Sequence, residues 1–161
     1  MNNQNTTVPA KLSFDWQDVE HDTVTLVKKI KESGALYKGM VVVSRGGLGV
    51  AALVSRLLDI KLLDIMCVAS YNHANSNKTE LQILKNPDLA QKDKGSGWLV
   101  VDDLIDSGDT YKYIIKILPQ ADFACLYNKS NQESFVKNIF FAKNCPRDSW
   151  IEFPWETITN N

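Results

Sequence analysis

Acidic and hydroxyl side chains gather in one short stretch near the middle of the chain. An apolar run over residues 98–101 leads into Asp102 and Asp103, and Asp106 comes directly ahead of Ser107-Gly-Asp-Thr110. When a Ser/Gly/Thr loop opens a helix, its backbone N–H groups lack intrahelical partners and are suited to binding a phosphate. Carboxylates beside a phosphate would repel it, so these acids have to face sugar hydroxyls, a divalent cation or a protonated ring nitrogen. The alternative is an ordinary strand-to-helix loop whose acids lie in solvent.

A second loop that contains glycines, Ser44-Arg-Gly-Gly47, follows a β-branched run over residues 40–43. The next residues, Gly47-Leu-Gly-Val-Ala-Ala52, fit the G-x-G-x-x-A pattern of dinucleotide-binding loops, with Asp64 further on. In that pattern the first glycine turns the chain directly after the strand, whereas three residues intervene here. The arginine also favours an anion that carries more negative charge than the pyrophosphate bridge of a dinucleotide. We therefore favour such an anion over a dinucleotide, with a bare structural turn as the alternative.

Helices and strands that could hold these two loops follow from the hydrophobic periodicity. Helices are predicted over residues 16–30 (with Gly34 as the stop), 48–58 and 111–118 (before Pro119), and strands over 40–43, 62–70, 98–101, 123–127 and 138–142. This alternation predicts an α/β fold with a mainly parallel central sheet flanked by helices. Strands connected by short helical segments also predict right-handed crossovers.

Length and composition are typical of one soluble domain spanning residues 1–161. Hydrophobic residues make up 44% and charged residues 23%, and the net charge of −1 gives no general attraction for nucleic acid. No apolar run approaches the roughly 20 residues that a membrane helix needs, and the N-terminus lacks the features of a signal peptide. Three cysteines without metal-type spacing also fit a cytoplasmic protein. Residues 1–10 are predicted to be a disordered tail, and the polar stretch 71–97 a flexible flap.

The stretch Val100-Val-Asp-Asp-Leu-Ile-Asp-Ser-Gly-Asp-Thr110 resembles the phosphoribosyl-pyrophosphate (PRPP) signature of the type I phosphoribosyltransferase family. Ser44-Arg-Gly-Gly47 is similar to the pyrophosphate loop of the same family. With Ala69-Ser-Tyr71 and the terminal Trp150-Ile-Glu-Phe-Pro-Trp155, these stretches occur in the order seen in bacterial xanthine-guanine phosphoribosyltransferases. The resemblance runs from about Trp16 to Glu156. It implies the type I phosphoribosyltransferase fold with a mobile flap.

The resemblance implies that PRPP is held by three groups of residues. The loop ahead of the helix predicted over 111–118 would cradle the 5′-phosphate through Asp106, Ser107, Gly108, Asp109 and Thr110. The loop after the strand predicted over 40–43 would hold the pyrophosphate through Ser44, Arg45, Gly46 and Gly47, and Arg45 would also be catalytic. Asp102 and Asp103 would bind the ribose hydroxyls, and Mg²⁺ would be reached by Asp103, less strongly by Asp102 and Glu156.

One departure from the family pattern lies in the phosphate loop. Asp109 replaces a glycine at a position that varies across the family. If its side chain pointed inward, the affinity for PRPP would suffer, so we expect it to face solvent.

The purine site implied by the resemblance uses residues from the second half of the chain. Lys129 would donate to the 6-oxo group, Trp150 would stack on the ring, and the backbone near Ile151 would accept from a 2-amino group. Asp106 would take the proton from N7 as the glycosidic bond forms, and Ser70 and Tyr71 would lie at the base of the flap. The alternatives are a plain surface role for Lys129, core roles for Trp150 and Trp155, and a simple strand-end aromatic at Tyr71.

The expected activity is therefore a purine salvage reaction on guanine, xanthine or hypoxanthine, and sequence does not fix the order among these bases. A PRPP-fold regulatory protein that reads nucleotides or RNA, and a dinucleotide-dependent oxidoreductase, are the rival functions. The resemblance also implies a homotetramer. Some members of the family associate weakly with the inner membrane, and nothing in the sequence decides that point.

Overall fold

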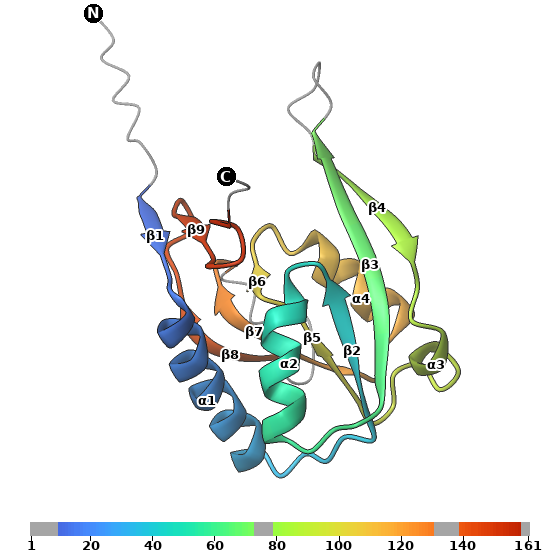
Figure 1. Cartoon of the computed structure of the whole chain (residues 1–161). Coiled ribbons are helices and arrows are strands. Elements are labelled where there is room, and N and C mark those ends of the chain that lie inside the picture. Colours follow the sequence, from blue (N-terminus) through green and yellow to red (C-terminus); the bar gives the residue numbers. More distant parts are fainter. Residues whose placement is uncertain (1–9, 73–78, 131–138, 159–161) are drawn as a thin grey trace, which may run out of the picture.

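The computed structural model describes residues 10–72, 79–130 and 139–158, and every structural statement below concerns these residues (Figure 1). The helices are α1 (Trp16–Glu32), α2 (Gly47–Leu57), α3 (Asp88–Gln91) and α4 (Asp109–Ile117). The strands are β1 (Lys11–Ser13), β2 (Gly39–Ser44), β3 (Leu63–Asn72), β4 (Thr79–Lys85), β5 (Trp98–Val101), β6 (Leu104–Ile105), β7 (Asp122–Asn128), β8 (Ile139–Asn144) and β9 (Trp150–Glu152). The predicted tail lies outside the described residues, except for residue 10.

A seven-stranded sheet forms the centre of the fold, in the order β4-β3-β2-β5-β7-β6 with β8 also paired to β7. Every pairing in it is parallel except that of β3 with β4. A separate pair, β1 with β9, is parallel as well. The predicted α/β fold with a mainly parallel sheet is confirmed. None of the helices in the described part of the chain is long and apolar enough to span a membrane.

Strands β5 and β6 run along the same edge of β7 in one register. Leu99 pairs with Asp122 and Leu104 pairs with Tyr127, which is the same offset in both strands. Between them the backbone stays attached to β7, because Asp102 donates its N–H to Ala124 and the Asp103 carbonyl accepts from Leu126 and Tyr127. Asp102 and Asp103 therefore interrupt a continuous line of strand instead of following its end. The sequence did not predict β6.

Helix α1 begins at the residue that the sequence predicts and ends two residues later than predicted. Asp15 caps it, and its side chain and that of Asp18 each accept a hydrogen bond from the other residue's backbone N–H. Ser33 closes the last turn, and Gly34 follows with a φ of +73°. The helix therefore runs two residues beyond the predicted end at Ile30.

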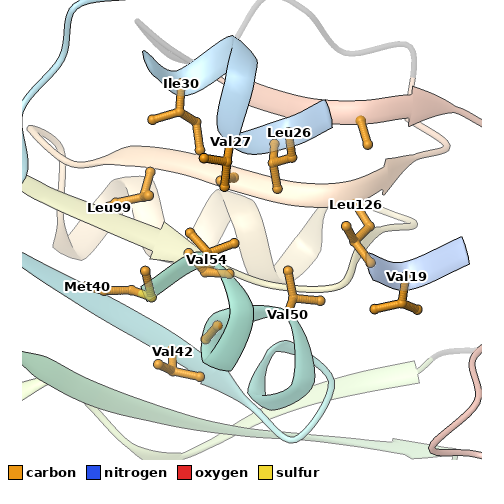
Figure 2. Close-up of a cluster of buried hydrophobic side chains, with 14 of the residues drawn as sticks. Val19, Leu26, Val27, Ile30, Met40, Val42, Val50, Val54, Leu99 and Leu126 are labelled. Carbon is orange, nitrogen blue, oxygen red and sulfur yellow. The ribbon is translucent and has the colours of Figure 1, made fainter. Parts of the chain in front are cut away.

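The apolar core lies on both faces of the sheet. On one face, α1 and α2 pack over β2, β5 and β7, as Figure 2 shows for Val19, Leu26, Val50, Val54 and Leu99. On the other face, alternate residues of the same strands contact α3 and α4, with the buried side chains Val41, Val43, Val100, Tyr111 and Ile114. Burial on both faces explains why these strands read as continuous apolar runs in the sequence.

Much of the predicted flap, residues 71–97, has regular secondary structure, and its flexibility stays a prediction. Strand β3 continues to Asn72 and pairs with β4, so the two form an antiparallel hairpin. Leu81 and Ile83 alternate along β4 opposite Ser70 and Val68, a period-two pattern too short to predict a strand from the sequence. Helix α3 follows the hairpin, and residues 73–78 lie outside the described residues.

Candidate active site

Two loops meet at the carboxyl edge of the sheet, where parallel β2 and β5 both end. The first follows β2, and the second follows β6, the two-residue strand that continues the line of β5 along β7. A Cβ on Gly46 would overlap the Asp103 carboxylate, and a Cβ on Gly47 would lie 2.6 Å from the Val101 carbonyl oxygen. Only glycine allows this approach of the first loop to the acids. The structure therefore brings the predicted pyrophosphate loop against the predicted ribose acids, and the Ser44–Arg45 peptide within that loop is cis.

Gly47 and Gly49, the two glycines of the dinucleotide-type pattern, both have packing roles. Gly47 is required by its contact with the β5 backbone. Gly49 lies against Trp155, since a Cβ there would come within 3.1 Å of the indole ring. Both glycines of the G-x-G-x-x-A match are thus explained by packing inside the protein.

The adjacent acids Asp102 and Asp103 are electrostatically unfavourable when both are charged. Asp102 is buried, and its Oδ1 accepts a 2.9 Å hydrogen bond from the backbone N–H of Asp103. Burial raises the pKa of Asp102 well above its usual value, and the nearby charge of Asp103 adds to the rise. Burial also raises the pKa of Asp103 to about 6. The hydrogen bond with Asp102 lowers this pKa, and the negative charge of Glu156 raises it. A cation or hydroxyl donors at this position would relieve the repulsion.

Glu156 and Glu152 lie near this region in different ways. The Oε2 atom of Glu156 accepts a 3.0 Å hydrogen bond from the backbone N–H of Phe153, while its charge acts on Asp103. Glu152 instead points to β1, where Lys11 lies 2.8 Å from its carboxylate and the Ser13 hydroxyl donates at 3.0 Å. Across the described ranges, no group of three or more His, Cys, Asp or Glu side chains is arranged to hold a metal by itself.

The second loop, residues 106–110, opens helix α4. Gly108 precedes the helix with a φ of +82°, a left-handed conformation that favours glycine. Asp109 is the first helical residue, and its carboxylate accepts a 2.9 Å hydrogen bond from the Ser107 hydroxyl. Its side chain is 58% exposed. The expectation that Asp109 faces solvent therefore holds only in part, because the carboxylate stays bound to the loop.

Lys129 lies directly after β7 and is only 7% exposed. Its Nζ is 2.7 Å from Oδ1 of Asp106, whose own side chain is 65% exposed. The backbone N–H of Lys129 also donates to the Ile105 carbonyl, which fixes this position beside β6. The plain surface role for Lys129 is wrong. The structure joins the predicted purine lysine and the predicted proton acceptor in one ion pair.

Strand β9 carries Trp150 and Ile151. Trp150 is 64% exposed, so a core role does not apply to it, whereas Ile151 is buried. Trp155 is half-buried and stacks on Phe153 with ring centroids 4.6 Å apart, so the core role fits this tryptophan. Sequence reasoning missed β1, which pairs with β9 along its whole length. Its three residues are too short a signal to distinguish from an irregular segment.

Ser70 and Tyr71 lie in β3, in the part that pairs with β4. Because β3 is parallel to β2, its carboxyl end lies at the same edge of the sheet as the two loops. Figure 1 shows the β3–β4 hairpin rising from that edge. The backbone positions of these two residues thus agree with the base of a segment that borders the site.

Comparisons with known proteins agree with this arrangement. Residues 14–159 match the model of the phosphoribosyl transferase domain family. The chain is 38% identical to a xanthine-guanine phosphoribosyltransferase from Idiomarina loihiensis over 88% of its own length and 84% of the relative's.

Solved structures share the fold. A purine phosphoribosyltransferase from Pyrococcus horikoshii matches with a TM-score of 0.70 and 25% identity, over 94% of this chain and 97% of that one. A hypothetical protein from Neisseria gonorrhoeae with bound ppGpp matches with a TM-score of 0.78 and 23% identity, over 94% and 92%. The glycine-lined loop, the paired acids and the helix-opening loop meet at one edge of the sheet. Together with this arrangement, the match to the family model and the similarity to the Idiomarina loihiensis enzyme establish that the chain belongs to the phosphoribosyltransferase family.

Proposed function

We propose that this protein is a purine salvage enzyme that transfers the 5-phosphoribosyl group of PRPP to N9 of a 6-oxopurine. The C1–oxygen bond to pyrophosphate breaks, the bond from C1 to N9 forms, and the products are a nucleoside monophosphate and pyrophosphate. The observation that supports this most is the ion pair between Lys129 and Asp106. It joins a donor suited to a 6-oxo group with an acceptor suited to the purine proton.

PRPP binding is divided between the two loops in this proposal. The backbone of residues 44–47 and the Arg45 guanidinium hold the pyrophosphate and stabilise its charge as it departs. The amides and hydroxyls of residues 106–110 hold the 5′-phosphate at the start of α4. Asp102 and Asp103 accept hydrogen bonds from the ribose hydroxyls.

Purine recognition rests on Lys129, Trp150 and Ile151. A lysine that donates to a 6-oxo group discriminates against adenine, because the 6-amino group of adenine would place a second donor against the buried lysine ammonium. Stacking on the exposed Trp150 contributes roughly 1–3 kcal/mol. The backbone N–H and C=O groups of Trp150 and Glu152 point to β1. Because these groups alternate in direction along a strand, the N–H and C=O of Ile151 point away from β1, to the other edge of β9. The Ile151 carbonyl is thus suited to accept from a 2-amino group.

During transfer, Asp106 accepts the proton from N7 as N9 forms its bond. Lys129 contacts that carboxylate at 2.7 Å, and in this proposal its ammonium also donates to the 6-oxo group of the base. Closure of the segment that begins near Ser70 and Tyr71 keeps water from the ribosyl cation-like transition state.

Mg²⁺ is the metal that fits these residues. Asp102 and Asp103 are neighbouring carboxylates whose pKa values are raised by burial, and Glu156 adds negative charge. Mg²⁺ is bound through one or two carboxylates together with substrate phosphates and water, so a site with few protein ligands suits it. When bound, it neutralises charge on the pyrophosphate as that group leaves. Asp103 would hold it, with Asp102 and Glu156 as weaker contributors.

Further parts of the proposal are one transferase domain across residues 1–161 and a cytoplasmic location, which length and composition support. The resemblance alone implies a homotetramer, and peripheral contact with the inner membrane as in some members of the family. The second candidate, a regulatory protein that binds nucleotides or RNA without turnover, shares the fold and differs in activity.

The experiment that tests the function is pyrophosphate release from PRPP and Mg²⁺ with guanine, xanthine, hypoxanthine and adenine in turn. We expect turnover with the 6-oxopurines and none with adenine. Lys129→Met should retain PRPP binding and lose at least about tenfold of the preference for 6-oxopurines, since it leaves the oxo group unpaired. A folded protein that binds nucleotides and releases no pyrophosphate at any Mg²⁺ concentration would establish the regulatory alternative.

A further inference from the structure

Asp109 places a carboxylate inside the loop that we assign to the 5′-phosphate. Its Oδ2 accepts a 2.9 Å hydrogen bond from the Ser107 hydroxyl, and its own backbone N–H lies 3.4 Å from the same hydroxyl oxygen. Lys112, almost one helical turn further along, contacts Oδ1 at 3.3 Å. Ser107 is one of the donors expected to serve the phosphate. In this structure that donor already serves a carboxylate of the protein itself.

The charge of Asp109 is stabilised where it lies. The hydrogen bond from Ser107 and the contact with Lys112 hold the pKa of Asp109 below its usual range. As the first residue of α4, the carboxylate also lies at the positive end of the helix dipole. The same features attract a phosphate to this loop. Asp109 and a sugar phosphate thus depend on the same donors and the same end of the helix.

We propose that Asp109 is an internal competitor of the sugar 5′-phosphate, which lowers the affinity for PRPP, and that Lys112 limits this loss by neutralising the carboxylate. The inference rests on the proposed function of residues 106–110. It explains how an acid can occupy this position: Ser107 and Lys112 bind the carboxylate in this structure, and an incoming phosphate must take Ser107 from it.

The test measures dissociation constants for PRPP, guanosine 5′-monophosphate and guanosine with the full-length protein and its Asp109 variants. Asp109→Asn removes the charge and retains an acceptor for Ser107, so we expect roughly threefold to tenfold tighter binding of both phosphorylated ligands. Asp109→Ala also frees Ser107 and should bind them more tightly still. Guanosine, which lacks the phosphate, should bind all three proteins equally. The gain should shrink at high salt, because screening weakens charge repulsion.

A matched control exists on α3. Asp88 is also an acid in the first turn of a helix and is paired with a lysine three residues away, Lys85, at 3.1 Å. It lies outside the loop, so Asp88→Asn should leave all three dissociation constants unchanged. A tightening in this control equal to that of Asp109→Asn would overturn the proposal, because it would show a general charge effect.

A second set of variants tests the role of Lys112. If it neutralises Asp109, Lys112→Ala should weaken PRPP binding severalfold in the wild-type background and have no effect in the Asp109→Ala background. An equal loss in both backgrounds would show that Lys112 contacts the ligand directly and would overturn its assigned role.

The outcomes also separate this inference from the proposed function. A wild-type protein that binds PRPP, with Asp109 variants that bind it equally or more weakly, overturns the competitor role alone. A folded wild-type protein that binds neither PRPP nor the nucleoside monophosphate overturns the proposed function, and the competitor role with it. Melting temperatures of the variants establish that each one is folded under the conditions of the assay.

Discussion

The loop after β2 and the loop after β6 each open a helix at the same edge of the sheet, yet they are built differently. In the first, Gly46 and Gly47 press against Asp103 and the Val101 carbonyl with no room for a side chain. In the second, the Asp106 and Asp109 side chains are mostly exposed and each is paired with a lysine. Close packing of its backbone holds the first loop in place, whereas ion pairs between side chains hold the second. Substitutions in the two loops should therefore fail in different ways.

The largest effect is expected in the loop built from side chains. Asp106→Ala removes the proposed proton acceptor, and we expect kcat to fall by about a thousandfold while the dissociation constant for PRPP changes much less. Steady-state kinetics with guanine, together with PRPP binding by calorimetry, measure the two quantities. Asp106→Asn is the matched variant, since it keeps the size and loses the charge. Equal losses of turnover and binding would contradict the proton-acceptor role.

The loop built from backbone contacts is tested by Gly46→Ala. The added methyl group overlaps the Asp103 carboxylate, so the loop must shift, and we expect kcat/KM for PRPP to fall about a hundredfold. Gly97→Ala is the control, because the φ of +73° at Gly97 strains any added side chain while a Cβ there meets only ordinary contacts. It should lower the melting temperature and leave kinetics unchanged. Nearly normal kinetics in Gly46→Ala would show that packing does not fix this loop.

The acids between the two loops predict a pH dependence of stability. The pKa of Asp103 is about 6 in the folded protein, above the value of about 4 expected when unfolded. Its favourable contribution is therefore fully present below about pH 4 and is lost as the pH rises through about 6. Asp103→Asn removes this dependence, so relative to wild type its unfolding free energy should rise by about 2–3 kcal/mol between pH 4 and pH 7.5.

Denaturant unfolding without Mg²⁺ measures this difference across pH. Asp148→Asn, a change at an exposed acid, serves as the control and should show no such trend. A constant offset between Asp103→Asn and wild type at all pH values would contradict the raised pKa.

The smallest effect is expected where side chains hold the purine-binding strand. Lys11 and Ser13 bind Glu152 and hold its pKa below the usual range. The pair lies at the surface, so removing both partners should raise KM for the purine by only about threefold and leave KM for PRPP unchanged. Kinetics of the double variant Lys11→Ala, Ser13→Ala with guanine give both constants. An equal rise in the two would show that β1 acts on the whole fold instead of on β9.

Much of the fold and site could be predicted because the informative residues are contiguous. Residues 98–110 contain a strand, two acids and a helix-opening loop in one run, and the buried strands read as apolar stretches. Strand β6 was missed because Leu104 and Ile105 are two residues between acids, and only pairing with β7 makes them a strand. Strand β4 was missed because polar residues separate its few apolar ones.

Contacts between distant residues were harder to predict than positions. The resemblance implied that Lys129 binds the purine and that Asp106 takes its proton, but it gave no sign that the two side chains pair. That pairing depends on the register of β6 along β7, which places Lys129 beside Ile105. In the same way, the hold of Ser107 and Lys112 on Asp109 depends on side-chain directions at the start of α4, which a motif does not specify.

The unbroken register of β5 and β6 along β7 has one further result. A single strand, β7, sets the spacing between the acids that we assign to the ribose and the lysine that we assign to the base, because Asp102 and Asp103 bond to its middle and Lys129 follows its end. Replacing an apolar residue within β7 alters packing but keeps that spacing. Adding or deleting one residue there would turn every later side chain to the other face of the sheet and carry Lys129 away from Asp106. Lineages of this enzyme should accordingly accept varied residues in this strand while keeping its length constant.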